Sequence, residues 1–136
     1  MIYAVIDTNV LVSALLTSNP EAATVKVMEA LFCGRFIPLY NEDIFDEYVD
    51  VLNRPRFHFS KILIEQYLEI FKERGIRAHR VLCKESFPDP KDIVFYEVAL
   101  SKEDAFLVTG NSKHFPKTPI VVSPTEMMDI LNTTNN

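Results

Sequence analysis

Three acidic residues occupy positions from which their carboxylates can act together. Asp7 directly follows the apolar run 2–6, Glu47 lies in a segment with helical periodicity, and Asp92 follows a loop with two prolines. Clustered carboxylates repel one another, so bringing them together is costly unless a cation lies among them. Mg²⁺ and Mn²⁺ take hard oxygen ligands from one or two carboxylates, water and phosphate. The pattern therefore predicts a site for one of these two cations.

Each of these carboxylates also has an ordinary structural explanation. Asp7 is a good helix N-cap residue, and Asp92 can stabilise the start of a helix through the macrodipole. Glu47 borders the apolar stripe of its helix, where a half-exposed surface glutamate is equally acceptable. Asp89, in the loop before Asp92, is an alternative cap that would leave Asp92 free for another role.

Further polar side chains follow the apolar run 105–108. Thr109 and Asn111 offer neutral oxygens, and Gly110 permits a tight turn or a close backbone approach. Both this run and 2–6 are predicted strands, so the residues after them should share the carboxyl edge of one sheet. A plain turn from strand to loop explains the same residues.

Short apolar runs alternate with segments of helical periodicity along the chain. The predicted strands cover 2–6, 36–39, 76–82, 105–108 and 120–122. The predicted helices cover 8–17, 22–33, 41–53, 60–74, 92–101 and 124–131, with Asn41 and Ser60 as N-caps and Gly34 and Gly75 as stops. This alternation predicts a three-layer α/β/α sandwich with a mostly parallel central sheet of about five strands. In such sheets the ligand site lies at the carboxyl ends of the strands, at the topological switch point.

The length of 136 residues fits one domain, which we expect to cover residues 1–132, followed by a frayed tail at 133–136. Cys33 and Cys83 form no paired motif and are expected to be reduced thiols, and the histidines and cysteines show no zinc spacing. The first residues are too short an apolar run for an export signal, and no stretch is long enough to span a membrane. We therefore expect a cytoplasmic protein.

The formal net charge is −5, opposite in sign to that of most sequence-independent nucleic-acid binders. Any contact with a nucleic acid must therefore come from a local basic patch, a partner or bound metal ions. One candidate patch is Lys113, His114 and Lys117. A second is formed by Arg54, Arg56, His58 and Lys61, although solvated surface charge explains both sets equally well.

Three segments, in order, resemble the motifs of PIN domains. They are Val5-Ile6-Asp7-Thr8-Asn9-Val10-Leu11, then Glu47 with Val51-Leu52 and Arg54-Pro55-Arg56-Phe57, then Asp89-Pro90-Lys91-Asp92 with Ala99-Leu100 and the run 105–110. No single motif is specific, but all three occur at suitable spacing and in the expected strand and helix context. The resemblance spans essentially the whole chain and is closest to VapC-like toxins of bacterial toxin–antitoxin systems.

The resemblance implies cleavage of single-stranded RNA with the help of Mg²⁺ or Mn²⁺. Asp7, Glu47 and Asp92 would then be the catalytic, metal-binding carboxylates, and Thr8 and Asn9 would orient Asp7 or the substrate. From their positions in the sequence, Asp89 and Thr109 are expected to support the site, Asn111 to offer the metal ion a neutral oxygen, and Lys113 and His114 to hold phosphates of the RNA. Many PIN domains have Asp at the position of Asn111, so this chain would bind a second metal ion less tightly or not at all. The family also implies an antitoxin partner and a homodimer, and the apolar residues Phe57, Phe59, Ile62 and Tyr67 suggest a groove or dimer surface.

Three functions are compatible with the sequence. The first is a metal-dependent endoribonuclease, in which a divalent cation activates water for attack on a phosphodiester. The second is a catalytically weak PIN-fold module that binds RNA or an antitoxin, an alternative favoured by the negative charge and by Asn111. The third is a receiver- or phosphatase-like Mg²⁺-binding domain, although no D-x-D-x-[TV] motif follows the first strand.

Overall fold

The apolar runs of the chain form one sheet of five parallel strands. The computed structural model describes residues 1–134 and contains β1 (Tyr3–Ile6), β2 (Ile37–Tyr40), β3 (Ile76–Arg77), β4 (Phe106–Val108) and β5 (Val121–Val122). Their order in the sheet is β3-β2-β1-β4-β5, and every neighbouring pair is parallel. Strands β2 and β3 lie on one side of β1, and β4 and β5 lie on the other. The order therefore reverses between β1 and β4, which is the switch point of a doubly wound sheet.

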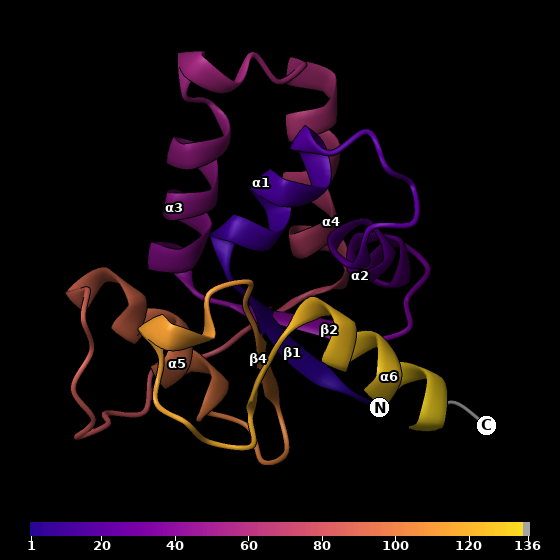
Figure 1. Ribbon diagram of the computed structural model, residues 1–136. Helices are drawn as coiled ribbons and strands as arrows, with labels where there is room; N and C mark the ends of the chain where they lie inside the picture. Colours follow the sequence, from indigo (N-terminus) through magenta and orange to yellow (C-terminus); the bar gives the residue numbers. More distant parts are fainter. Residues whose placement is uncertain (135–136) are drawn as a thin grey trace.

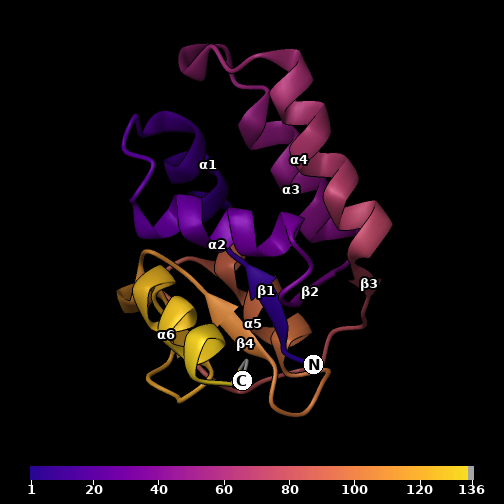
Figure 2. The same ribbon diagram turned by 90° about the vertical axis from the view of Figure 1, so that its right-hand side faces the viewer.

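Helices cover both faces of this sheet, so the predicted α/β/α sandwich is confirmed. They are α1 (Thr8–Leu16), α2 (Ala23–Phe32), α3 (Glu42–Leu52), α4 (Lys61–Arg74), α5 (Ile93–Ala99) and α6 (Pro124–Thr134). Helix α5 lies on one side of β1 and β4, and α6 lies on the other (Figure 1). Helices α1, α3 and α4 extend past the edge of the sheet at which β1 ends (Figures 1 and 2). Within the described residues, no helix is both long enough and apolar enough to cross a bilayer.

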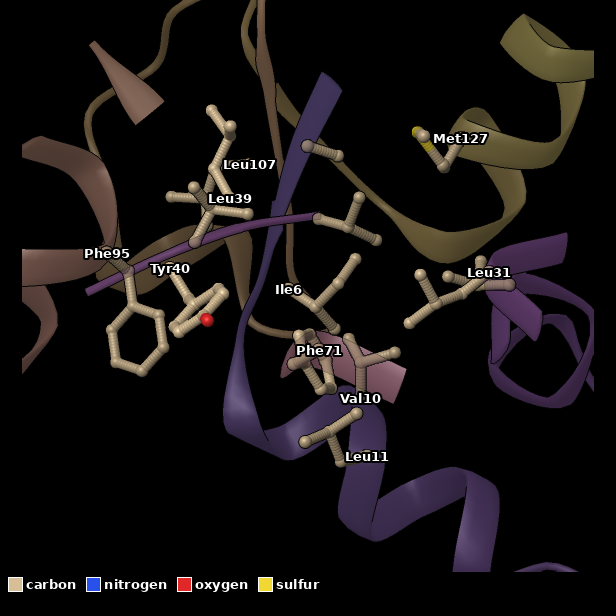
Figure 3. Close-up of a cluster of buried hydrophobic side chains, with 14 of the residues drawn as sticks. Ile6, Val10, Leu11, Leu31, Leu39, Tyr40, Phe71, Phe95, Leu107 and Met127 are labelled. Carbon is tan, nitrogen blue, oxygen red and sulfur yellow. The ribbon is translucent and has the colours of Figure 1, made fainter. Parts of the chain in front are cut away.

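Fully buried side chains from every layer fill the space between helices and sheet. Ile6 and Leu107 come from the central strands, Leu11 and Leu31 from one set of helices, and Phe71 from α4 (Figure 3). The near-continuous apolar sequence of β1 and β4 follows from this placement, because a parallel strand covered on both faces has no solvent side.

The third strand is much shorter than the predicted 76–82. Only Ile76 and Arg77 pair with β2, because β2 itself ends at Tyr40. The chain then turns to α5, where Arg80 contacts the buried carboxylate of Glu97 at 2.7 Å and the Cys83 N–H donates to it at 2.9 Å. Burial opposes the charge of Glu97, but the hydrogen bonds from Cys83 and Arg80 outweigh it and lower the pKa of Glu97. A glutamate inside the otherwise apolar helix α5 was the sequence signal for this anchor.

Two helix boundaries also differ from the predicted ones. The predicted helix 92–101 is divided into a 3₁₀ turn, η2 (Pro90–Asp92), and α5, since Pro90 initiates a tight turn before the α-helix begins. Helix α6 continues to Thr134, so residues 133 and 134 of the predicted tail are helical. The other two residues of that tail, 135 and 136, lie outside the described residues.

Both predicted glycine stops end helices, but for different reasons. Gly34 has a φ of 75°, the left-handed conformation expected of a helix stop. Gly75 has an ordinary φ of −84°, so it is not a left-handed stop. A Cβ at Gly75 would lie 2.3 Å from the Phe71 carbonyl oxygen and 2.9 Å from Cε1 of Tyr40. Gly75 is therefore required by the close approach of α4 to β2.

We predict that Gly75→Ala lowers the free energy of unfolding by about 1–3 kcal/mol, because the backbone must move to admit the methyl group. Urea denaturation measures this change. Gly110→Ala is the matched control, since its Cβ would meet no atom closer than Oδ1 of Asn9 at 3.6 Å. Equal unfolding midpoints for the two variants would contradict the close packing seen at Gly75.

Candidate active site

The carboxyl ends of β1 and β4 bring Asp7 and Thr109 together. The Asp7 N–H donates to the Val108 carbonyl at 2.9 Å, and the Thr109 hydroxyl donates to Oδ2 of Asp7 at 2.8 Å. Asp7 stands at the N-cap position of α1, yet its side chain makes no capping hydrogen bond. The side chain is only 6% exposed. Helix capping therefore does not explain a carboxylate at this buried position.

Glu47 reaches the same region from α3. The Thr8 hydroxyl donates to Oε2 of Glu47 at 2.5 Å, so Thr8 orients Glu47 and makes no such bond to Asp7. Asn9 instead joins the two strand ends, since its Oδ1 accepts from the Gly110 N–H at 3.2 Å. The loop after β1 thus connects to both α3 and the loop after β4.

Asp92 completes the group from the start of α5. Asp89 accepts a hydrogen bond from the Lys91 N–H at 3.0 Å and is the cap, so the side chain of Asp92 remains free of that role. Oδ2 of Asp92 is buried and accepts no hydrogen bond from residues 1–134. Nδ1 of His114 lies 3.3 Å from this oxygen, an ion-pair distance when the imidazole is protonated, but without hydrogen-bond geometry.

The loop after β4 supplies the remaining predicted residues. The Asn111 N–H donates to Oγ1 of Thr109 at 2.9 Å, while the Asn111 side chain is exposed. A 3₁₀ turn, η3 (Ser112–His114), follows and carries His114 to Asp92. Lys113 is exposed on the same turn. The second basic patch is partly engaged elsewhere, because Arg54 pairs with Asp50 at 3.1 Å.

Burial and mutual repulsion disfavour negative charge at this group. Burial raises the pKa of Asp7 to about 6, the hydrogen bond from Thr109 opposes the rise, and the charges of Asp92 and Glu47 add to it. Burial also raises the pKa of Asp92, and the charge of Asp89 contributes next. The carboxylates from three separate elements are therefore close enough to act on one another. A bound cation would relieve both costs.

Tyr48 is a positioning residue that the sequence analysis did not identify. Its hydroxyl donates to the carbonyl oxygen of Ile6 at 2.5 Å, and its ring packs against Phe71 with 4.8 Å between centroids. Burial raises the pKa of Tyr48 well above its usual value, and the charges of Asp7 and Glu47 act in the same direction. The bond ties α3 to the end of β1, beside both carboxylates. The only signal in the sequence was a tyrosine next to Glu47 on the apolar face.

The carboxylate oxygens of Asp7, Glu47 and Asp92 are ligands that suit a hard divalent cation, although the three side chains do not surround one common point. Within residues 1–134, no three His, Cys, Asp or Glu side chains form a group that could hold a metal ion as they stand. Mg²⁺ usually keeps several waters and binds through one or two carboxylates, so it does not require such a cage. The buried Oδ2 of Asp92 and the raised pKa of Asp7 are the features that a cation would satisfy.

The fold and site together define a doubly wound α/β domain with an acidic group at its switch point. The family model of the PIN domain matches residues 3–113, which is most of the chain. The chain therefore belongs to the PIN domain family, whose members are generally nucleases and typically use divalent metal ions. This membership decides against a receiver- or phosphatase-like domain. A comparison with curated proteins finds no match.

The pKa of Asp7 leads to a prediction about stability without metal. The folded protein keeps the Asp7 proton up to about pH 6, whereas the unfolded chain loses it near the ordinary value of 3.8. The folded state therefore binds more protons in this window, and its stability falls by about 3 kcal/mol as the pH rises from about 4 to about 6. We expect Asp7→Asn to abolish most of this fall, as measured by urea denaturation in EDTA across the window.

The exposed Asp46 of the same helix as Glu47 provides the control, because Asp46→Asn removes one carboxylate outside the buried group. This variant should lose stability with pH as the wild type does. Two results would show that Asp7 is not held in a protonated, buried state. One is a wild-type free energy of unfolding that stays constant between pH 4 and 6. The other is one that changes with pH as it does in Asp7→Asn.

Proposed function

We propose that this PIN domain is a metal-dependent endoribonuclease that hydrolyses phosphodiester bonds of single-stranded RNA. The observation that carries the proposal is that three separate segments bring carboxylates to one end of the sheet. Thr109 holds Asp7, Thr8 holds Glu47, and Asp92 has a buried oxygen with no hydrogen-bond partner within residues 1–134. Such a group is costly for a binding surface but useful for holding a cation against a phosphate. The family membership supports the nuclease class.

In this proposal Asp7, Glu47 and Asp92 hold Mg²⁺ or Mn²⁺. A bound ion of this kind supplies an activated water and stabilises negative charge on the phosphate during in-line attack. Thr109 keeps Oδ2 of Asp7 in place, and Thr8 does the same for Oε2 of Glu47, so both carboxylates are oriented before the ion arrives. Asn111 contributes a neutral oxygen at most, which supports one tightly bound ion rather than two.

In this proposal His114 and Lys113 contact phosphates of the RNA. The imidazole of His114 lies 3.3 Å from Asp92 and is about half exposed, so it can hold Asp92 and contact a phosphate oxygen from the same position. Lys113 is the adjacent exposed cation on η3. Lys113 therefore supplies positive charge on the same turn that carries His114 to Asp92, in a chain whose net charge is −5.

A second candidate is a catalytically weak PIN-fold module that binds RNA or a protein partner. The specific observation in its favour is that the carboxylates of residues 1–134 form no preassembled group of three metal ligands. In that case the acidic group would be a remnant of the family site, and binding would not require a metal ion.

The decisive measurement is cleavage of a mixed single-stranded RNA pool by purified protein with Mg²⁺ or Mn²⁺. We expect cutting that stops in EDTA and falls by more than about 100-fold in Asp7→Asn, because even the partners of metal ligands cost about 10–100-fold when removed. Asp46→Asn should cut like the wild type, since its side chain is exposed and lies outside the group. Folded wild-type protein that cuts under no metal would reject the enzyme and favour the binding module.

We further propose the cellular setting that the family resemblance implies: a VapC-like toxin in the cytoplasm, paired with an antitoxin protein and forming a homodimer. The apolar surface near the start of α4 supports the dimer. Ile62 is 68% exposed there, and the rings of Phe57 and Phe59, a few residues earlier in the chain, stack on each other with 5.1 Å between their centroids. Tyr67 is not free for such a surface, because its ring packs on Phe32.

We predict that light scattering gives the mass of a dimer for the wild type and of a monomer for Ile62→Glu, because a charge cannot be buried at an apolar interface without a partner. The control is Leu82→Glu, which adds the same charge at an equally apolar residue that is 88% exposed on another segment. A monomeric wild type, or an Ile62→Glu protein that remains dimeric, would exclude this surface as the dimer interface.

A further inference from the structure

A cleft with a volume of about 530 Å³ opens between η3 and the start of α6. Its walls include Lys113 and Lys117, with Phe115 and two prolines, Pro116 and Pro119, between and beside them. Pockets for small ligands have volumes of roughly 300–1,000 Å³, so one nucleotide is of suitable size. Most of these residues lie beyond residue 113, where the match to the family model ends.

The cleft carries positive charge that the protein does not neutralise. Lys113 and Lys117 are exposed, and within residues 1–134 neither ammonium group lies in an ion pair. Between Asp104 and Glu126 the sequence contains no acidic residue. Glu126 is the only acid in the lining, and its Oε1 is engaged at 2.8 Å by the Ser123 N–H in a capping box. The two lysines are therefore available to a ligand with negative charge.

The same cleft has an apolar floor, which we define as Phe115 with the two prolines. Phe115 is only 6% exposed, and its ring meets Phe87 edge to face with 6.1 Å between centroids. Pro116 and Pro119 lack backbone N–H donors. A ligand that suits both parts of the cleft has a flat, weakly polar portion and a charged phosphate, as a nucleotide does.

The cleft and the acidic group are connected by a single turn of chain, η3. Lys113 belongs to the cleft, and the next residue, His114, reaches Oδ2 of Asp92 at 3.3 Å. A strand of RNA with one phosphate at the carboxylates can therefore place a neighbouring nucleotide beside η3.

We propose that this cleft is a subsite for one nucleotide of single-stranded RNA, adjacent to the phosphate held at the carboxylates. Lys113 and Lys117 contact the backbone phosphates of that nucleotide, and its base rests on the apolar floor formed by Phe115 and the two prolines. The placement of the nucleotide next to a scissile phosphate rests on the ribonuclease function proposed above, whereas binding in the cleft does not require cleavage.

Binding is tested with wild-type protein in EDTA and a fluorescently labelled single-stranded RNA hexamer, by anisotropy across a range of salt concentrations. Each phosphate contact on a single strand contributes about 0.7 to the slope of log affinity against log salt. We expect Lys113→Ala combined with Lys117→Ala to lower that slope by about 1.4 and to weaken binding by about tenfold or more in 0.1 M salt. Lys84→Ala, at an exposed lysine outside the cleft, should change neither.

The role of the base is tested with an abasic hexamer of the same charge. We expect the wild type to bind it at least about fivefold more weakly than the normal RNA, because stacking of bases adds affinity. The loss should be smaller in the double-lysine variant, since two changes in one subsite are not additive. Equal binding of abasic and normal RNA by the wild type would show that only phosphates are held and would overturn the nucleotide subsite.

The outcomes separate this inference from the proposed ribonuclease. A wild type that cleaves RNA, with a double-lysine variant whose RNA affinity and KM match those of Lys84→Ala, would overturn the subsite and keep the enzyme. The subsite would stand and the ribonuclease would be rejected if the wild type binds RNA but cuts none with any metal, and if only the double-lysine variant loses this binding. A folded wild type with no measurable binding of RNA in EDTA would overturn the subsite.

Discussion

The parallel pairing of β1 with β4 is the constraint on which the site depends. It joins two segments about a hundred residues apart in sequence, so that Thr109 donates to Asp7 across the strand ends. Because both strands are covered by helices on both faces, their ends cannot slide without disturbing the core. The other contributors are tied to this pair: Asn9 to the loop after β4, and Tyr48 of α3 to the carbonyl oxygen of Ile6.

The site is held in place by bonds that oppose its own electrostatics. Burial raises the pKa of Asp7 to about 6, the neighbouring carboxylates add to the rise, and hydrogen bonds from the Thr109 hydroxyl and the Thr8 backbone only partly compensate. Such an arrangement costs stability and persists when the surrounding structure over-determines it. The aromatic packing of Tyr48 with Phe71 and Phe95, and the buried anchor at Glu97, provide that surrounding rigidity. The carboxylates that could bind a cation therefore lower the stability of the metal-free protein.

Charge is divided between two neighbouring regions of one edge of the molecule. The carboxylates lie at the ends of β1 and α5 and on α3, whereas the loop that follows β4 has no acidic residue until Glu126. His114 stands at the boundary and contacts Asp92. A chain with a net charge of −5 can thus carry a local cationic surface next to an acidic group.

Local patterns in the sequence determined the strand and helix order and the α/β/α class, and they indicated Asp7, Glu47 and Asp92 as candidates for the site. The reason is that apolar runs, Asn41 as a cap and Gly34 as a left-handed stop act over a few residues. Partnerships between distant residues were decided only by the tertiary structure. The Thr8 hydroxyl holds Glu47, Gly75 is needed for a contact with β2, and the third strand ends early because β2 itself ends at Tyr40. Each of these depends on which elements become neighbours, and no local periodicity carries that information.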